Sequence, residues 1–436
     1  LKVNTTGASN TAVGEEALTA ITTGAYNTGV GLSAGAAITT GSQNVAVGMY
    51  AGDAITTAQE NTCIGNHSGG SLTTGGYNTA LGKSALQNSN TGTYNVAVGA
   101  SCMWNAQTTG SYNVAMGHQA AKPLTSSNNT VAIGRDTSRN TTTASDNTAV
   151  GYAALYSNTT GVYNVAIGGE SLYNVTTSSQ NTAVGYLAAA YATNSSNVAI
   201  GYKALRGVDG STTGDANVVI GEKSGQNVTT GSDDVFVGYR SGYNNTTGKE
   251  NVFIGHNAGY SVTTGNENTC VGQSAGYSVV SGNYNVFIGR KAGQNTTTAQ
   301  YNTAVGVKSL HNNTSGETNT AVGLHSLFSN TTASQNCAFG YRALFNNTTG
   351  LRNCAFGYIT MESLTTGNQN TAYGYEAMRA YTTGYSSTAV GHGALDSATT
   401  GYNNNSFGVD SLRQCTTGVQ NHAFGNDALS GITTGS

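Results

Sequence analysis

The polar and apolar positions of this chain repeat with a period of seventeen residues. The composite repeat reads N-[TV]-A-[VI]-G-x-x-[AS]-[LG]-x-x-x-T-T-G-x-x, and it is first complete at residues 10–26. The Gly at its fifth position occurs in 25 copies, from Gly14 to Gly425, and only spacings of 18, 16 and 20 residues interrupt the period. Self-similarity at a fixed period of this length indicates a solenoid in which each copy forms one rung.

The first five residues of each repeat are predicted to form a β-strand. Two Gly and several β-branched residues in seventeen positions disfavour a helix. In a strand, the second and fourth side chains point to one face and the third to the other. We expect the large apolar residues at the fourth position, such as Val13, Ile254 and Phe339, to meet the core. The third position is nearly always Ala, apart from a local cluster formed by Phe236, Phe253 and Phe287.

The period also limits the size of one coil. Seventeen residues at about 3.3 Å each give a perimeter of at most about 56 Å, enough for two short strands roughly 10 Å apart and two turns. The Thr-Thr-Gly segment is expected to supply a turn, with its Gly at positive φ. Equivalent residues on successive rungs should stack about 4.8 Å apart, which predicts ladders of Asn on Asn and Thr on Thr.

These features predict an all-β fold, a parallel β-solenoid (β-roll) of about 25 rungs. We expect one continuous repeat domain over residues 1–436, with irregular rungs near residues 100–130 and 186–220, and we interpret the chain as a piece of a longer fibre. Surplus residues near Trp104 and in residues 206–217 should leave the ladder as bulged turns, and Pro123 should lie in a turn. A Gly at the ninth position tends to accompany an aliphatic residue at the twelfth, so these two positions should share one volume.

Composition changes this picture little but excludes several functions. Charged residues make up 8% of the chain, against about 25% in an ordinary soluble domain. With a net charge of −3 and no basic run, the chain is not expected to bind nucleic acid, and no apolar run is long enough for membrane insertion. The six cysteines show no metal-binding spacing, and we expect no metal and no cofactor. Cys337 and Cys354 fall on neighbouring rungs within disulfide range; stacked free thiols are the favoured alternative.

Several repeats resemble those of a known family. The segments NVAIG at residues 164–168 and 197–201, and TVAIG at 130–134, are similar to the head-domain repeats of YadA-like trimeric autotransporter adhesins, including a small residue three positions after the Gly, as at Thr137 and Ser171. The form NTAVGxxALxxNTTGxx also resembles repeats of long phage tail-fibre and bacterial surface-fibre proteins. The resemblance implies a left-handed β-roll with three chains side by side. Here each rung is about three residues longer, so a self-sufficient single chain stays an alternative.

Two tyrosine columns are the candidate binding residues. One precedes the Asn of the repeat, and the other follows the fifth-position Gly and includes Tyr341, Tyr358 and Tyr375. Such rows could contact glycans, or they could stack between rungs or chains with their hydroxyls in water. The Thr pairs fit an ice-binding array poorly, because adjacent Thr side chains point to opposite faces. Carboxylates are scattered, whereas glycoside cleavage needs two that converge across a groove, so no catalytic residues are assigned and no enzyme is expected.

The sequence therefore predicts a structural and adhesive role as the shaft or head of an extracellular fibre on a cell surface or a virion. The alternative is a phage tail fibre or a carbohydrate-binding or depolymerising spike. The expected partners are other copies of the chain, as a homotrimer or an end-to-end filament, and cell-surface glycans or a host receptor. If the third-position Ala face packs against sister chains, the resemblance favours the trimer.

Overall fold

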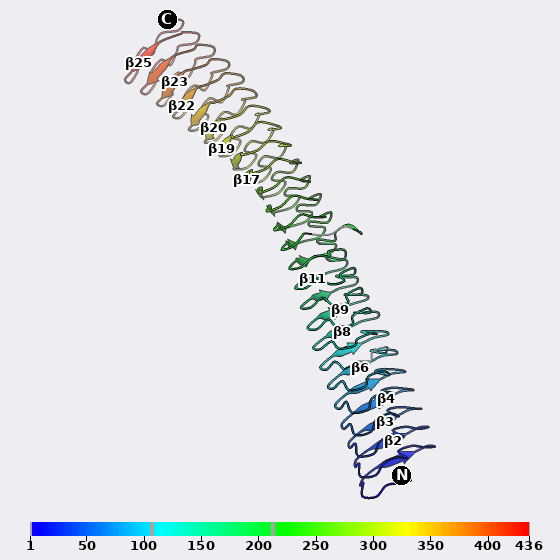
Figure 1. Cartoon of the computed structure of the whole chain (residues 1–436). Coiled ribbons are helices and arrows are strands. Elements are labelled where there is room, and N and C mark those ends of the chain that lie inside the picture. Colours follow the sequence, from blue (N-terminus) through cyan, green and yellow to red (C-terminus); the bar gives the residue numbers. More distant parts are fainter. Residues whose placement is uncertain (1, 105–108, 211–213, 436) are drawn as a thin grey trace. The chain divides into compact units, whose positions relative to one another are not determined.

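The computed structural model describes residues 2–104, 109–210 and 214–435. Within these ranges the regular secondary structure consists of β-strands, without helices. The chain divides into two compact units, Leu1–Asn217 and Val218–Ser436. Each unit is a parallel β-solenoid built from successive rungs (Figure 1). This confirms the predicted fold class. The boundary between the units falls within the irregular segment near residues 186–220, and a single continuous domain stays a prediction.

Each strand covers the second to fourth positions of one repeat. Among its described residues the first unit holds β1 (Thr11–Val13), β2 (Thr28–Val30), β3 (Val45–Val47), β4 (Thr62–Ile64), β5 (Thr79–Leu81), β6 (Val96–Val98), β7 (Val114–Met116), β8 (Val131–Ile133), β9 (Thr148–Val150), β10 (Val165–Ile167), β11 (Thr182–Val184) and β12 (Val198–Ile200). The second unit holds β13 (Val218–Ile220), β14 (Val235–Val237), β15 (Val252–Ile254), β16 (Thr269–Val271), β17 (Val286–Ile288), β18 (Thr303–Val305), β19 (Thr320–Val322), β20 (Cys337–Phe339), β21 (Cys354–Phe356), β22 (Thr371–Tyr373), β23 (Thr388–Val390), β24 (Asn405–Phe407) and β25 (His422–Phe424).

Neighbouring strands pair in parallel, one repeat apart. Ala12 of β1 pairs with Gly29 of β2, which pairs with Ala46 of β3. In the second unit, Phe236 of β14 pairs with Phe253 of β15 in the same way. Equivalent positions of the repeat are therefore stacked, as the period predicts.

Among the described residues each rung has one strand, although its perimeter left room for two. Residues at the seventh and ninth positions have positive φ, as at Glu16 (57°) and Leu18 (47°), and such residues interrupt an extended segment. Backbone hydrogen bonds still join the rungs on this side. The Leu18 nitrogen donates to the Ala34 carbonyl at 3.1 Å, and the Thr22 nitrogen to the Thr39 carbonyl at 3.0 Å.

The two faces of the strands are the reverse of the prediction. The third-position side chain is buried in almost every strand, whereas the fourth-position side chain lies outside; Val13 is 56% exposed and Ile254 is 39% exposed. The coil interior is filled from the opposite wall by ninth- and twelfth-position residues such as Leu18 and Ile21. Little room is left for the third position, which explains its Ala. The Ala column therefore lies inside each coil and is not available to sister chains.

Residues in the interior compensate for one another in size. An added Cβ at Gly52 would lie 2.8 Å from Ile55 Cδ1, so the ninth and twelfth positions share one volume as predicted. The third position takes part as well, which the sequence reasoning did not foresee. A Cβ at Gly259 would lie 2.5 Å from the ring of the buried Phe253. Where Leu18 and Ile21 are both large, the next rung has Gly29, whose added Cβ would lie 2.8 Å from Leu18 Cγ.

A ladder of buried Asn side chains follows the first position of the repeat. The Asn27 side-chain oxygen accepts hydrogen bonds from the backbone nitrogen and the side-chain amide of Asn44, both at 3.0 Å. The Asn44 amide also donates to the Ala58 carbonyl at the end of its own rung, at 2.9 Å. Each such Asn thus binds the preceding rung and closes its own. Thr side chains form the second predicted ladder, in which the Thr56 hydroxyl donates to the Thr73 carbonyl at 3.1 Å.

The two glycines of the repeat are required for different reasons. Gly14 has a φ of +123°, which side-chain-bearing residues rarely adopt, and its added Cβ would lie 2.7 Å from the Gly31 oxygen. The Gly of the Thr-Thr-Gly segment does not have positive φ, so that prediction is wrong. At Gly265 the reason is space, because an added Cβ would lie 2.5 Å from the Gly282 carbonyl oxygen of the next rung.

The irregular repeats agree with the predicted bulges where the structure describes them. Trp104 and Pro123 lie in turns, outside the strands. The rest of the first bulge falls on residues 105–108, which lie outside the described residues. In the second bulge, residues 206–210 and 214–217 lie outside the strands (Figure 1), and residues 211–213 are not among those described.

Candidate functional site: aromatic ladders and a charged cluster

The predicted column Tyr341, Tyr358 and Tyr375 forms a continuous stack. The ring centroids of Tyr341 and Tyr358 are 5.0 Å apart, those of Tyr358 and Tyr375 are 5.2 Å apart, and His392 extends the stack by a further 5.2 Å. Rings this close cover one another's faces, so a sugar ring cannot lie between them. The geometry favours a structural role, and glycan contact at the ring edges stays a prediction.

The column that precedes the Asn is exposed and also stacks. Tyr77, Tyr94 and Tyr112 are stacked with centroid separations of 4.7 and 5.1 Å. Each of these residues has a positive φ, near 60°, which turns the chain just before the strand. A groove of about 380 Å³ runs beside Tyr77 and Tyr94 over Thr57, Gln59 and other residues of the turn. The Gln59 amide donates to the Tyr77 hydroxyl at 3.2 Å.

A third set of aromatic stacks lies at the tenth position of the repeat and was missed in the sequence. Its longest tyrosine run is Tyr243, Tyr260 and Tyr277, with separations of 5.2 and 5.0 Å. The signal that could have revealed it is the recurrence of an aromatic residue directly after the Leu or Gly at the ninth position, as in Leu172-Tyr173 and Gly242-Tyr243.

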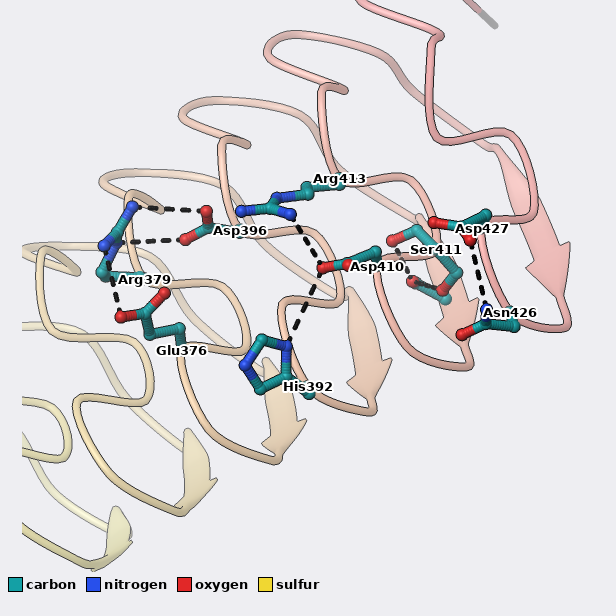
Figure 2. Close-up of polar contacts among 10 residues, drawn as sticks. Glu376, Arg379, His392, Asp396, Asp410, Ser411, Arg413, Asn426 and Asp427 are labelled. Atoms are coloured by element: carbon teal, nitrogen blue, oxygen red, sulfur yellow. Dashed lines mark hydrogen bonds and ion pairs between the residues drawn. The ribbon is translucent and has the colours of Figure 1, made fainter.

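Charged residues gather on three successive rungs of the second unit, as Figure 2 shows. The Arg379 guanidinium contacts Asp396 at 3.1 Å and Glu376 at 3.5 Å. On the far side of Asp396, Arg413 contacts Asp410 at 3.3 Å. The repeated spacing of an acid and an Arg three residues later, at 376/379 and 410/413, is the signal that sequence reasoning overlooked.

The electrostatics of this cluster favour ion pairing within the fold. Burial raises the pKa of Asp396, and the charge of Arg379 opposes that shift. Gly393 leaves space for the Asp410 carboxylate, because a Cβ there would collide with it. The Arg contacts engage these carboxylates within the protein (Figure 2), so the cluster offers no pair of carboxylates free to flank a bond to be cleaved.

One ionisable residue lies inside the Asn ladder. Asp234 replaces Asn in its rung, and its carboxylate accepts hydrogen bonds from the Asn251 backbone and amide and from the Asn245 amide, at 2.9 to 3.1 Å. Burial raises the pKa of Asp234 to about 7, although these hydrogen bonds counter the shift. The residue is a candidate pH-dependent element of the ladder.

The cysteine pair faces outward on the sheet. Cys337 and Cys354 are Cα partners at the first residue of β20 and β21, the second position of the repeat, and both are half-buried free thiols. Burial raises the pKa of the Cys337 thiol to about 11, and the neighbouring Cys354 makes a smaller contribution in the same direction. Among the described residues, no group of three or more His, Cys, Asp and Glu side chains could hold a metal ion.

Comparison with models of known protein families and with curated proteins finds no match. Within the described ranges, no helix has the length and apolar character needed to cross a membrane.

Proposed function

We propose that this chain is a structural and adhesive segment of an extracellular fibre, displayed on a cell surface or a virion, without a catalytic role. The observation that carries the proposal is the constant register of the parallel rungs within each unit, with a buried Asn ladder along them. Such units gain stability from each added neighbour and present the same surface again and again. Within the charged cluster, the Asp396 and Asp410 carboxylates contact arginines, which supports a structural role for that cluster.

The outer face of the sheet supports self-association. Large apolar side chains at the fourth position are exposed in a row along each unit: Val13, Ile64, Leu81, Met116, Ile133, Ile167 and Ile200 in the first, and Ile220, Ile254, Ile288, Tyr373, Phe407 and Phe424 in the second. Extended apolar surfaces of this kind mark interaction sites. The proposed partners are sister chains, and the resemblance to trimeric adhesin heads favours a homotrimer.

Lysine substitutions on two neighbouring rungs test this proposal. Met116→Lys with Ile133→Lys places two charges on the outer sheet face, and analytical ultracentrifugation or native mass spectrometry should then show loss of the oligomer. Ser126→Lys with Thr143→Lys is the matched control, since these exposed residues lie on the turn side of the same two rungs. A monomeric wild-type chain, or equal assembly of both variants, would contradict the proposal.

A carbohydrate-binding spike remains the second candidate. The groove beside Tyr77 and Tyr94 favours it, because an aromatic edge next to amide and hydroxyl groups suits a polyhydroxylated ligand. Binding of oligosaccharides by the intact chain, with loss in a Tyr94→Ala variant, would support this candidate.

A further inference from the structure

A cleft of about 400 Å³ lies where the first unit departs from its repeat. It is lined by Ser157, Asn174, Thr176, Tyr191, Thr193, Asp209 and Gly210. A volume of this size is at the lower end of the range for small-ligand sites. The residues come from three rungs and from the excursion that follows β12, so the cleft is not repeated along the regular rungs.

An aromatic residue at the eleventh position of one repeat, in place of the tenth, forms the floor of the cleft. Tyr156 and Tyr173 lie at the tenth position of consecutive rungs and stack at 5.1 Å. The next repeat has sixteen residues, and its aromatic residue, Tyr191, comes one position later. The backbone hydrogen bonds place Tyr191 in line with Ser157 and Asn174, because each of these nitrogens donates to the equivalent carbonyl of the next rung. The tyrosine stack therefore does not continue, and a ring lies beside hydroxyl and amide groups.

The excursion after β12 supplies the wall of the cleft. Gly207 and Gly210 have φ of 74° and 78°, and they turn the chain back over the earlier rungs. The Asn174 amide donates to Asp209 Oδ1 at 3.2 Å, across 35 residues of sequence. This bond holds an otherwise exposed carboxylate at the edge of the cleft.

The chemistry of the lining limits what can bind. None of the described residues that line the cleft is cationic, and Asp209 is anionic, so phosphate and carboxylate ligands are disfavoured. The Arg206 guanidinium is not among the lining residues, and it lies over one face of the Tyr191 ring, 5.7 Å from the ring centroid, where it stabilises that ring. A carboxylate, an amide, three Ser and Thr hydroxyls and an aromatic ring together offer hydrogen-bonding groups and one flat apolar surface.

We propose that this cleft is a binding site for a neutral pyranose, as a free sugar or as the end of a glycan. The Tyr191 ring contacts the apolar C–H face of the sugar, Asp209 accepts hydrogen bonds from its hydroxyls, and Ser157 and Asn174 bind its remaining oxygens. The inference deepens the adhesive role proposed above and rests on it for its biological meaning. It assigns recognition to a single irregular site, apart from the column at Tyr341, Tyr358 and Tyr375.

Saturation-transfer NMR with the intact chain tests this site. The probes are the methyl glycosides of mannose, galactose, glucose and N-acetylglucosamine at millimolar concentration. At least one should receive saturation, and Asp209→Asn and Tyr191→Ala should each weaken its binding by fivefold or more. Tyr173→Ala and Asp146→Asn are controls outside the cleft, and they should leave the binding unchanged.

Other outcomes overturn the inference. The first is an absence of saturation transfer to all four glycosides, and the second is transfer that persists in both cleft variants. The third is that the cleft binds lysine amide, a cationic probe, and none of the glycosides. Circular dichroism of each variant shows whether the fold is retained, and Asp209→Asn preserves the acceptor for Asn174. Sedimentation of the same samples reports self-association separately, so loss of assembly with retained glycoside binding would refute the fibre proposal but not the cleft.

Discussion

The side-chain oxygen of Asn44 accepts two hydrogen bonds from Asn61, one from its backbone nitrogen and one from its amide, both at 3.1 Å. Asn44 is fully buried, and its own amide reaches the previous Asn and the Ala58 carbonyl. One side chain therefore satisfies buried polar groups on three successive rungs. This explains why 22 of the 25 repeats keep Asn at the first position.

We expect Asn44→Ala to destabilise the rungs around β3 by about 3 kcal/mol, because several buried donors and acceptors lose their partners at once. Native-state hydrogen exchange of residues 27–78 is the measurement, since a solenoid opens locally before it unfolds as a whole. Asn66→Ala is the control at a half-exposed position and should change the free energy of opening by less than about 0.5 kcal/mol. Equal exchange rates in both variants would refute a structural Asn ladder.

Asp234 should make the second unit less stable as the pH rises. Its pKa of about 7 in the folded state lies above the value of about 3.9 for an unfolded Asp, so the folded chain binds the proton more tightly. Stability is then highest below about pH 4, falls as the pH rises to about 7, and is nearly constant above that. Asp234→Asn should remove this dependence and stabilise the surrounding rungs by a few kcal/mol at pH 8, on the order of 3 kcal/mol.

Hydrogen exchange at pH 5 and pH 8, corrected for the intrinsic rates, measures that effect in residues 218–268. Asp233→Asn is the matched control, because this neighbour is exposed and its removal should leave the pH dependence in place. The assignment to Asp234 fails if the Asp234→Asn variant and the wild type lose stability equally between the two pH values.

The period of the sequence was sufficient to predict the parallel ladder, its register and the Asn and Thr stacking. It could not show which face of the strand is inside. The alternation of the strand places Ala46 on one face and Val45 and Val47 on the other. Side-chain size suggests that the Val face is inside, but the large residues that fill the coil come from the ninth and twelfth positions. In a coil one side chain thick, a small residue marks the inside when the opposite wall is occupied by residues such as Leu18.

The candidate sites depend even more on three-dimensional detail. The stack of Tyr341, Tyr358 and Tyr375 follows directly from the period. The contact between Asn174 and Asp209 does not, because it depends on the direction taken by the residues after β12. The ion pair of Arg379 with Asp396 joins two neighbouring rungs, so it depends on the position of each residue within its own rung. A motif within one repeat cannot predict it.

Cys337 and Cys354 should react slowly with alkylating reagents. A pKa of about 11 leaves Cys337 almost entirely protonated at pH 8, and burial raises the pKa of Cys354 as well. We expect iodoacetamide to modify Cys337 roughly 100-fold more slowly in the folded chain than in guanidinium chloride. Peptide mass spectrometry gives the rate at each site, and the fully buried Cys63 reports on unfolding. Rapid modification of Cys337 while Cys63 stays protected would contradict the expected protonation state.

The compensation between Phe253 and Gly259 can be tested by exchanging their sizes. Phe253→Ala should destabilise the second unit by about 4 kcal/mol through a cavity and a lost stack with Phe236, and Gly259→Leu by about 2 kcal/mol or more through overpacking. Together they recreate the native combination of Ala149 with Leu155, where Leu155 has a φ of 53°, close to the 57° of Gly259.

The double variant should therefore be more stable than the sum of the single changes predicts, by at least about 2 kcal/mol in a double-mutant cycle. Gly259→Leu combined with Phe287→Ala is the control, since Phe287 packs against Gly293 two rungs away and the two changes should be additive. Hydrogen exchange of residues 235–300 measures all of these variants. Additive effects of Phe253→Ala and Gly259→Leu would mean that the two positions do not share a volume. The preference for Ala at the third position would then need an explanation other than the large residues on the opposite wall of the coil.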